Sequence, residues 1–206
     1  MSNNKQLVQY LVESGAIKSK KVKEAFLKVD RGYFVPERWQ AYAYEDYPLE
    51  IAQGQTISQP TTVAFMLELL EVEEGDKILD IGAGSGWVSC LLAFLSGRNG
   101  EVDAFEINKS IGDFGREAVL KAGFENVNYT IGNAAKFWNK KKKYNKIYSG
   151  AAFEEIPLKL KESLLNEGVL VSPSQDNCIR KIIRKKSSFA EEVYPGFVFV
   201  PFLEDS

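Results

Sequence analysis

The chain has 206 residues, and its 26 lysines and arginines nearly balance its 28 aspartates and glutamates, for a formal net charge of −2. This balance gives no general electrostatic attraction to nucleic acid or to membranes. The sequence contains no histidine, which excludes imidazole base catalysis, Ser-His-Asp hydrolysis and most zinc sites.

A hydrophobic content of 45% is enough for a packed core, and the length indicates one domain over residues 1–206. Within it, we expect residues 1–75 to carry N-terminal helices and a substrate-side segment, and residues 76–206 to form the core. No apolar run reaches transmembrane length, and the first residues do not start a signal peptide. We therefore expect a soluble, cytoplasmic protein.

The first 70 residues combine helical patterns with a long segment of no clear pattern. Apolar residues at helical spacing predict helices over Asn4–Glu13 and Lys18–Val29. Residues Asp30–Gln59 show no sustained period and are rich in aromatic side chains, and so long a segment without regular structure is often functional. Pro60 suits the start of a helix, so we expect a helix there that continues over Thr61–Leu70.

The rest of the chain alternates between strand and helix patterns. Strands are predicted at Lys77–Ile81, Glu101–Glu106, Val127–Ile131, Lys146–Ser149 and Gly168–Ser172, and helices at Trp87–Leu95, Ser110–Ala122 (Asn108 as N-cap, Gly123 as stop) and Pro157–Leu165. Cys178–Arg184 and Glu192–Val200 are predicted to form a closing antiparallel pair. The alternation predicts an α/β fold with a doubly wound, mostly parallel sheet, and a ligand at the carboxyl ends of its strands.

A glycine-rich turn follows the first strand of this core. Gly82, Gly84 and Gly86 allow positive φ angles and let the backbone approach a ligand closely. The turn opens onto a helix N-terminus, where unpaired N–H groups face the ligand. Glu106 ends the next strand about 20 residues later, where a carboxylate can hold the hydroxyls of a ribose. The segment therefore predicts a nucleoside-type cofactor, against the alternative of an ordinary tight turn.

The acidic residue before the turn indicates which cofactor. A dinucleotide fingerprint reads G-x-G-x-x-G, whereas here Asp80 precedes Gly82, Gly84 and Gly86. An aspartate would repel a pyrophosphate and would attract the ammonium group of an amino acid. This favours S-adenosylmethionine (SAM), which has a sulfonium and an α-amino group and no phosphate. No metal is expected.

Two other features have structural interpretations. We expect Cys90 and Cys178, which lie in apolar patterns, to be buried reduced thiols and not a disulfide or a metal pair. The basic residues could form a nucleic-acid patch, but neighbouring acidic residues favour a solvated loop and strand edge. These basic residues are Lys140–Lys143, Lys146, Arg180, Lys181, Arg184, Lys185 and Lys186.

Several motifs together resemble the protein-L-isoaspartate O-methyltransferase family over roughly residues 20 to 203. The most distinctive is Gly54-Gln55-Thr56-Ile57-Ser58-Gln59-Pro60, ahead of the glycine turn. The others are Val29-Asp30-Arg31 with Phe34-Val35-Pro36, the turn Asp80–Trp87 itself, Ala151-Ala152 with Pro157, Leu164–Val171, and Pro195–Pro201. The glycine turn alone is shared with many methyltransferases.

This resemblance implies a Rossmann-like SAM methyltransferase that esterifies isoaspartyl residues of damaged proteins and peptides. We expect it to act as a monomer, with no nucleic-acid or membrane partner. Ser58 then matches the active-site serine. The cofactor-binding residues implied are Gln55, Thr56, Ile57, Asp80, Gly82, Gly84, Ser85, Gly86, Glu106, Ile107, Asn133 and Ala134. The reaction needs no base, because a carboxylate with a pKa of about 4 is already ionised near neutral pH. S-adenosylhomocysteine (SAH) and a methyl ester that cyclises to a succinimide would be the products.

One departure from the family pattern keeps other readings open. Gly132-Asn133-Ala134 stands where the family usually has Gly-Asp-Gly, and a neutral amide oxygen accepts a weaker hydrogen bond from adenine than a carboxylate does. A methyltransferase of the same build that acts on another carboxylate is therefore the main alternative, and a SAM-sensing module without activity is a lesser one. An RNA methyltransferase is disfavoured, since no Asn/Asp-Pro-Pro-aromatic motif is present.

Overall fold

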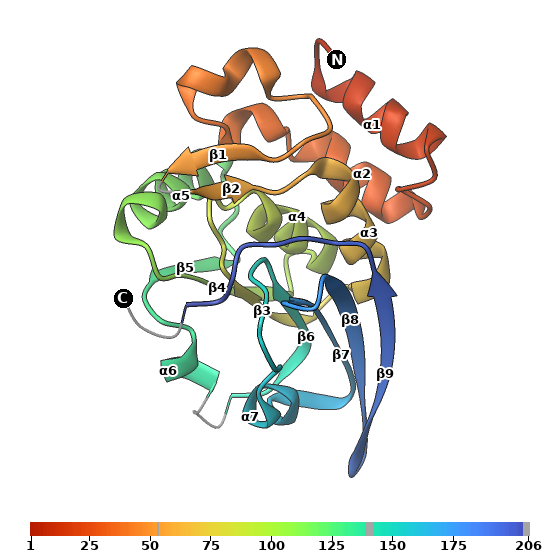
Figure 1. Ribbon diagram of the computed structural model, residues 1–206. Coiled ribbons are helices and arrows are strands. Elements are labelled where there is room, and N and C mark those ends of the chain that lie inside the picture. The colour runs from red at the N-terminus through yellow and green to blue at the C-terminus, as the bar shows by residue number, and fades with distance from the viewer. Residues whose placement is uncertain (53, 139–141, 204–206) are drawn as a thin grey trace.

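The computed structural model describes residues 1–52, 54–138 and 142–203. Its centre is a seven-stranded sheet in the order β5-β4-β3-β6-β7-β8-β9 (Figure 1). The strands are β3 (Lys77–Ile81), β4 (Glu101–Glu106), β5 (Val127–Ile131), β6 (Tyr144–Ser149), β7 (Leu164–Ser174), β8 (Cys178–Lys185) and β9 (Ser188–Pro195). β3 to β7 pair in parallel, and β8 and β9 close the sheet in antiparallel pairings. The predicted doubly wound, mostly parallel sheet is confirmed.

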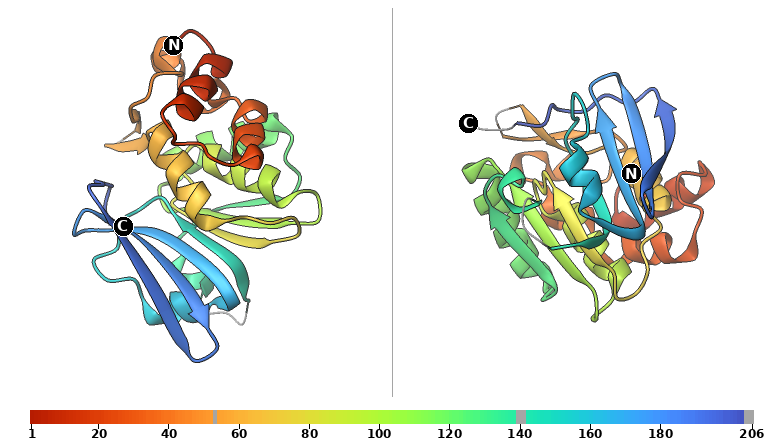
Figure 2. Two further views of the ribbon diagram at one scale, coloured as in Figure 1. Left: turned by 90° about the vertical axis from the view of Figure 1, so that its right-hand side faces the viewer. Right: turned by 90° about the horizontal axis from the view of Figure 1, so that it is seen from below.

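Helices cover both faces of the sheet. Successive strand residues point to opposite sides, so each strand contributes side chains to both faces. Ile78 lies in one apolar core and Leu79 in the other. The first core is covered by α3 (Pro60–Leu70), α4 (Trp87–Ser96) and α5 (Lys109–Ala122), and the second by the short helices α6 (Ala135–Trp138) and α7 (Leu158–Glu162) (Figure 2). None of the helices in the described parts of the chain is long and apolar enough to cross a membrane.

The predicted caps of α5 are present in the structure. The Asn108 side chain accepts hydrogen bonds from the backbone N–H groups of Ser110 and Ile111, at 3.0 and 3.3 Å. Gly123 ends the helix in the left-handed conformation with φ 75°. Both devices satisfy backbone groups that a helix end leaves unpaired.

Helices α1 (Asn4–Glu13) and α2 (Lys20–Lys28) form a further layer on α3 and α4. Their buried side chains belong to the same core as those of α3 and α4. Phe26 of α2 meets Trp87 of α4 edge to face, with ring centroids 5.5 Å apart. The Trp87 indole also donates a hydrogen bond to the Val29 carbonyl at 3.3 Å. The N-terminal helices are therefore packed directly behind the glycine turn.

The segment Asp30–Gln59 is more regular than its sequence indicates. It contains two 3₁₀ helices, η1 (Arg31–Phe34) and η2 (Glu37–Tyr42), and an antiparallel hairpin of β1 (Leu49–Ala52) and β2 (Gln55–Ile57). These elements are too short for a periodic pattern to appear. Long-range hydrogen bonds hold them, such as those of the Asp46 carboxylate with the N–H and hydroxyl of Thr61, at 2.9 and 2.7 Å.

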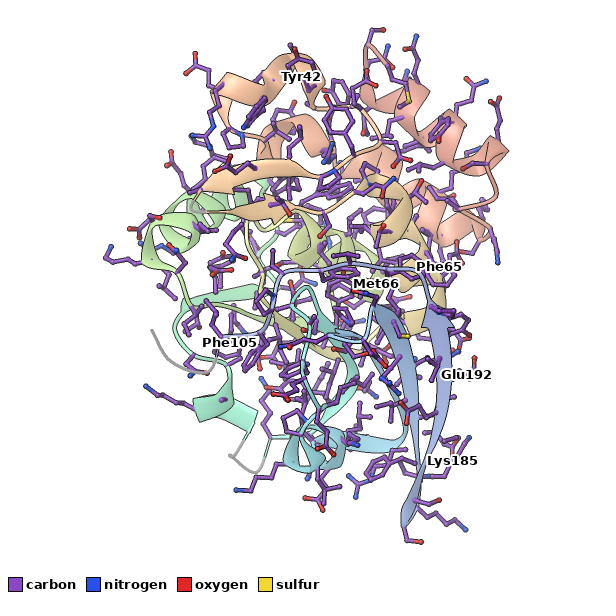
Figure 3. All side chains as sticks on the ribbon, viewed as in Figure 1. Tyr42, Phe65, Met66, Phe105, Lys185 and Glu192 are labelled. Atoms are coloured by element: carbon purple, nitrogen blue, oxygen red, sulfur yellow. The ribbon has the colours of Figure 1, made fainter. Side chains whose placement is uncertain are left out.

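The predicted closing antiparallel pair is confirmed, but the bounds predicted for its last strand, Glu192–Val200, are wrong. β9 runs from Ser188 to Pro195, and Gly196 follows with φ 97°. The N–H groups of Gly196 and Phe197 both donate to the Asn177 carbonyl, which turns the chain away from the sheet. Residues 197–203 then cross in front of the strand ends (Figure 1). Phe65 stacks on Phe197 at 5.2 Å where this crossing begins (Figure 3).

Other element boundaries also differ from the prediction, and one short helix was missed. Helix α7 ends at Glu162, and β7 begins at Leu164, earlier than the predicted Gly168. The helix α6 was not predicted, because only four residues form it.

The cysteines and the basic residues follow the prediction in part. Cys90 is buried and Cys178 is only half-buried, and both are free thiols. Lys146 and Lys181 are buried, not solvated, and Lys181 pairs with Glu71 at 2.8 Å. Lys185 lies at the tip of the β8–β9 hairpin, away from the glycine turn (Figure 3), and Lys140–Lys141 lie outside the described residues.

Candidate functional site

The glycine turn has the backbone conformation that its composition predicts. Gly82, Gly84 and Gly86 have φ angles of 75°, 55° and 82°, which residues with a Cβ rarely adopt. The N–H groups of Gly82 and the following alanine donate to the Phe105 carbonyl, at 2.9 and 3.0 Å. The turn is thereby fixed to the end of the neighbouring strand β4.

An open cleft lies in front of this turn, at the carboxyl ends of β3, β4 and β6. Its volume is about 1110 Å³, including the space open to solvent. The point where the strand order reverses, between β3 and β6, lies at this cleft, as expected for ligand sites of doubly wound sheets. The predicted site residues that line it are Gln55, Thr56, Ile57, Ser58, Gly82, Gly84, Ser85, Glu106, Ile107, Asn133 and Ala134.

Glu106 presents a fixed carboxylate to the cleft. One oxygen accepts a hydrogen bond from the Gly84 N–H at 3.0 Å, and the other accepts one from the Asn108 N–H at 2.8 Å. Burial raises the pKa of Glu106, and these backbone N–H groups partly offset the increase. Each carboxylate oxygen can accept a further hydrogen bond from a ligand, because an ionised carboxyl has about four acceptor positions.

Asp80 and Gly86 do not line the cleft. Asp80 lies behind the lining and is fully buried, with one carboxylate oxygen accepting from the Ser89 hydroxyl at 2.6 Å. Its other oxygen is buried without a hydrogen-bond partner. Burial raises the pKa of Asp80 to about 7, and the negative charge of Glu106 adds to the increase. Gly86 instead packs against α5, since a Cβ there would lie 2.4 Å from the Val119 side chain.

The departure at Asn133-Ala134 is accommodated without backbone strain. The Asn133 side-chain oxygen accepts from the Ala135 N–H at 2.8 Å, so it also caps the start of α6. Ala134 is buried, and its φ angle does not lie in the positive range that favours glycine. An alanine therefore takes the place of the family's glycine here at no conformational cost.

Ser58 lines the same cleft and directly follows β2. The hairpin pairs Leu49 with Ile57 and Glu50 with Thr56, which sets the direction in which the chain continues into Ser58. The side chain is half-buried, and within the described residues no group accepts a hydrogen bond from its hydroxyl. This hydroxyl is thus available to a ligand in the cleft.

Tyr148 and Val200–Leu203 are among the lining residues that the sequence did not identify. Tyr148 is fully buried beside Asp80 in the register of β3 and β6, and its hydroxyl lies 3.5 Å from the Met66 sulfur. Its place at the end of the predicted fourth strand was the available signal. Val200–Leu203 belong to the crossing segment, which is held by hydrogen bonds of 2.8 Å between Ala152 and both Val200 and Phe202.

The described residues contain no group of three or more Cys, Asp or Glu side chains placed to hold a metal ion. The cleft offers the Glu106 carboxylate, hydroxyls and backbone amides. Its polar groups form two sets, one around Glu106 and the glycine turn and the other around Ser58.

Comparisons with known proteins agree with this arrangement. The family described as protein-L-isoaspartate(D-aspartate) O-methyltransferase (PCMT) matches residues 2–206. A protein-L-isoaspartate O-methyltransferase of Ignicoccus hospitalis is 36% identical over 205 residues, covering 98% of this chain and 97% of the relative. Protein-L-isoaspartate O-methyltransferase 2 of Archaeoglobus fulgidus is 43% identical over 169 residues, covering 82% and 77%.

A solved structure has the same fold. The crystal structure of a Plasmodium falciparum β-aspartate methyltransferase (PCMT) with S-adenosyl-L-homocysteine superposes with a TM-score of 0.88 at 24% identity, over 100% of both chains. The family match, the relatives and the fold lead to one conclusion. The chain belongs to the protein-L-isoaspartate(D-aspartate) O-methyltransferase family.

Proposed function

We propose that this protein transfers a methyl group from SAM to the free carboxylate of isoaspartyl residues in proteins and peptides. The observation that carries the proposal is that one cleft is lined both by the glycine turn with Glu106 and by Ser58. A methyl donor and a carboxylate must meet in this way, in a space that both can enter.

The residues of the cleft fit SAM. Glu106 offers fixed carboxylate oxygens for ribose hydroxyls, and Asn133 offers an amide near the adenine. The unpartnered oxygen of Asp80 lies behind the turn and is suited to the positive amino-acid end. The hairpin residues Gln55, Thr56 and Ile57 line the cleft together with Gly82, Gly84 and Ser85. Ile107 and Ala134 also line it, and we assign them to the adenine end. When bound, SAM supplies an electrophilic methyl group on its sulfonium.

The protein then acts by orientation. The isoaspartyl carboxylate is ionised at neutral pH, given a pKa of about 4, so no base has to remove a proton. The Ser58 hydroxyl donates a hydrogen bond that directs one carboxylate oxygen along the line of the methyl group. Such positioning can be worth roughly 7–11 kcal/mol. A serine without a neighbouring base is a poor nucleophile, which favours the role of donor.

The methyl ester leaves the enzyme and cyclises to a succinimide, which hydrolyses partly to normal aspartate, so the activity initiates protein repair. We propose that this occurs in the cytoplasm and that the protein acts as a monomer. We also propose that residues 1–75 and 76–206 are parts of one domain, because α1 and α2 share a core with α3 and α4.

The test is methylation of a matched pair of peptides, one isoaspartyl and one aspartyl, with methyl-labelled SAM. We expect base-labile methyl ester on the isoaspartyl peptide alone, and a loss of about 100-fold or more in Ser58→Ala, as for removal of one donor in other active sites. Equal labelling of both peptides would contradict the proposal. No labelling, with SAM still bound in calorimetry, would favour another carboxylate substrate.

A further inference from the structure

Arg31 is a fully buried cation, and within the described residues its hydrogen bonds go to backbone carbonyls. One terminal nitrogen donates to the carbonyls of Ala43 and Glu45, at 2.8 and 3.2 Å. The other donates to the carbonyls of Tyr47 and Ser58, at 3.1 and 3.3 Å. The guanidinium therefore joins the loop before β1 to the residue after β2.

Burying the Arg31 charge in this arrangement lowers the stability of the fold. Burial lowers the pKa of Arg31 to about 10, and the Asp46 carboxylate partly offsets the decrease, so the group stays charged at neutral pH. The Nε atom is buried without a hydrogen-bond partner. Taking a charge out of water costs several kcal/mol, which carbonyl dipoles and one nearby carboxylate recover only in part. An apolar residue would fill the same space at a smaller cost in folding free energy. The presence of Arg31 is therefore explained better by the geometry of its hydrogen bonds than by a contribution to stability.

Arg31 also contacts the cofactor side of the cleft. Its guanidinium carbon lies 5.4 Å from the centroid of the Trp87 ring. Trp87 lines the cleft and is the first residue of α4, directly after the glycine turn. The planar guanidinium of Arg31 thus contacts both the Ser58 backbone and the Trp87 indole that follows the glycine turn.

We propose that Arg31 is a positioning residue for methyl transfer, which sets the Ser58 backbone at a fixed place relative to Trp87 and the glycine turn. This inference rests on the proposed role of Ser58. A lysine retains the charge and the stem, but its single ammonium cannot reach four carbonyls in one plane. A displacement of Ser58 by about 1 Å is expected to cost roughly 100-fold in rate.

The first experiment compares Arg31→Lys and Arg31→Met with wild type in peptide methylation and in SAH binding. We expect kcat to fall roughly 10- to 100-fold in both variants, while the Kd for SAH changes less than about threefold. Thr61→Val is the matched control, because it removes the hydroxyl bond to Asp46 in the same loop without touching Ser58. We expect its kcat to stay within about twofold of wild type. Unchanged kcat in Arg31→Lys, or a parallel loss of SAH affinity, would overturn the inference.

A double-mutant cycle separates positioning from a general loss of structure. If Arg31 acts through Ser58, adding Arg31→Lys to Ser58→Ala lowers kcat by less than about threefold beyond the single serine variant. If the two losses multiply, Arg31 does not act through Ser58 and the inference fails. The cycle uses Arg31→Lys, so it still decides the question if Arg31→Met does not fold.

A readout independent of activity keeps this inference distinct from the proposed function. In Arg31→Lys, hydrogen exchange of the amides in residues 43–47 and 55–58 is expected to speed up. In Thr61→Val, exchange of residues 55–58 is expected to stay as in wild type. Unchanged exchange in Arg31→Lys would overturn the inference, even in a protein that methylates no isoaspartyl peptide. If the wild-type protein methylates no isoaspartyl peptide but exchange still speeds up in Arg31→Lys as expected, only the proposed function is contradicted.

Discussion

At the scale of single residues, the charge of Asp80 depends on conditions near neutral pH. Its carboxyl is fully buried, and the resulting pKa of about 7 means that a large fraction is neutral at pH 6. The raised pKa has a cost for the free protein. The unfolded chain releases this proton near pH 4, so the contribution of Asp80 to stability is lost as the pH rises from about 4 through 7.

A bound ammonium group reverses this balance, because it favours the ionised carboxylate. We therefore expect the affinity for SAH to increase about eightfold between pH 6 and pH 7.5, following the ionised fraction of a group with a pKa of about 7. This range stays below the pKa of about 7.7–8.0 of an α-amino group. Isothermal titration calorimetry at the two pH values is the measurement.

Asp80→Asn is the control for this pH dependence. Glu106 also has a raised pKa and acts in the same direction, so the variant isolates the share of Asp80. We expect most of the increase to disappear in Asp80→Asn, together with weaker binding at pH 7.5. An increase of the same size in both proteins would assign the titration to Glu106 or to the ligand.

Gly86 is constrained in two ways, by its backbone and by its neighbours. Its φ is 82°, and a Cβ would lie 2.4 Å from Val119 Cγ2 and 3.1 Å from the Gly115 carbonyl oxygen. We expect Gly86→Ala to lower the free energy of unfolding by about 2–4 kcal/mol, the sum of left-handed strain and overpacking. Chemical denaturation measures this change.

Gly123 provides the matched comparison, since its φ is 75° and a Cβ there would meet no atom within 4 Å. We expect Gly123→Ala to lose only the backbone part, about 1 kcal/mol. Equal losses in the two variants would mean that the packing of the turn on α5 contributes little.

At the scale of elements, backbone hydrogen bonds and ring stacking hold the segment that crosses the cleft. Ala152 bonds to Val200 and Phe202, and the Phe202 ring stacks on Phe153 with centroids 4.4 Å apart. We expect Phe202→Ala to weaken SAH binding by roughly tenfold, equivalent to about 1.4 kcal/mol, because both stacking and a wall of the cleft are lost. Val198→Ala in the same segment is the control, since that side chain is 83% exposed. Equal affinities in the two variants would show that the crossing segment does not close the site.

The elements also show which parts of the fold the sequence could predict. Strands β3, β4 and β5 and helix α5 were found because each has its own period and local end signals, such as Asn108 and Gly123. The hairpin β1–β2 was not found, because its geometry depends on bonds from Arg31 and Asp46, which are distant in sequence. The end of β9 was missed for a similar reason, since Asn177 sets it from the turn between β7 and β8.

The same distinction applies to the cleft. Residues next to the glycine turn could be placed by spacing alone, whereas Tyr148 and Val200–Leu203 reach the cleft only through the sheet order and the crossing segment. Asp80 was predicted from its position in the motif, but its burial and its unpartnered oxygen depend on α4 packing over β3.

At the scale of the whole molecule, the N-terminal layer and the sheet share one core. Phe26 packs on Trp87, the Asn4 side chain donates to the Phe26 carbonyl at 2.7 Å, and Glu68 of α3 accepts from the N–H groups of Lys18 and Ser19. Residues 1–75 therefore cannot separate from the rest without exposing the back of the glycine turn. We expect the whole described chain to unfold in one cooperative transition.

Ligand binding tests this cooperativity, because the cleft is built from both parts of the chain. SAH at 100 times its Kd is expected to add about 2.7 kcal/mol to the free energy of unfolding. Hydrogen exchange followed by mass spectrometry, under conditions where exchange reports global opening, should show this increase equally in peptides from α1–α2 and from β3–β4. If α1 and α2 exchange at a much lower free energy and do not respond to SAH, they unfold independently. The N-terminal layer would then be an appendage to the cofactor core and not part of its cooperative unit.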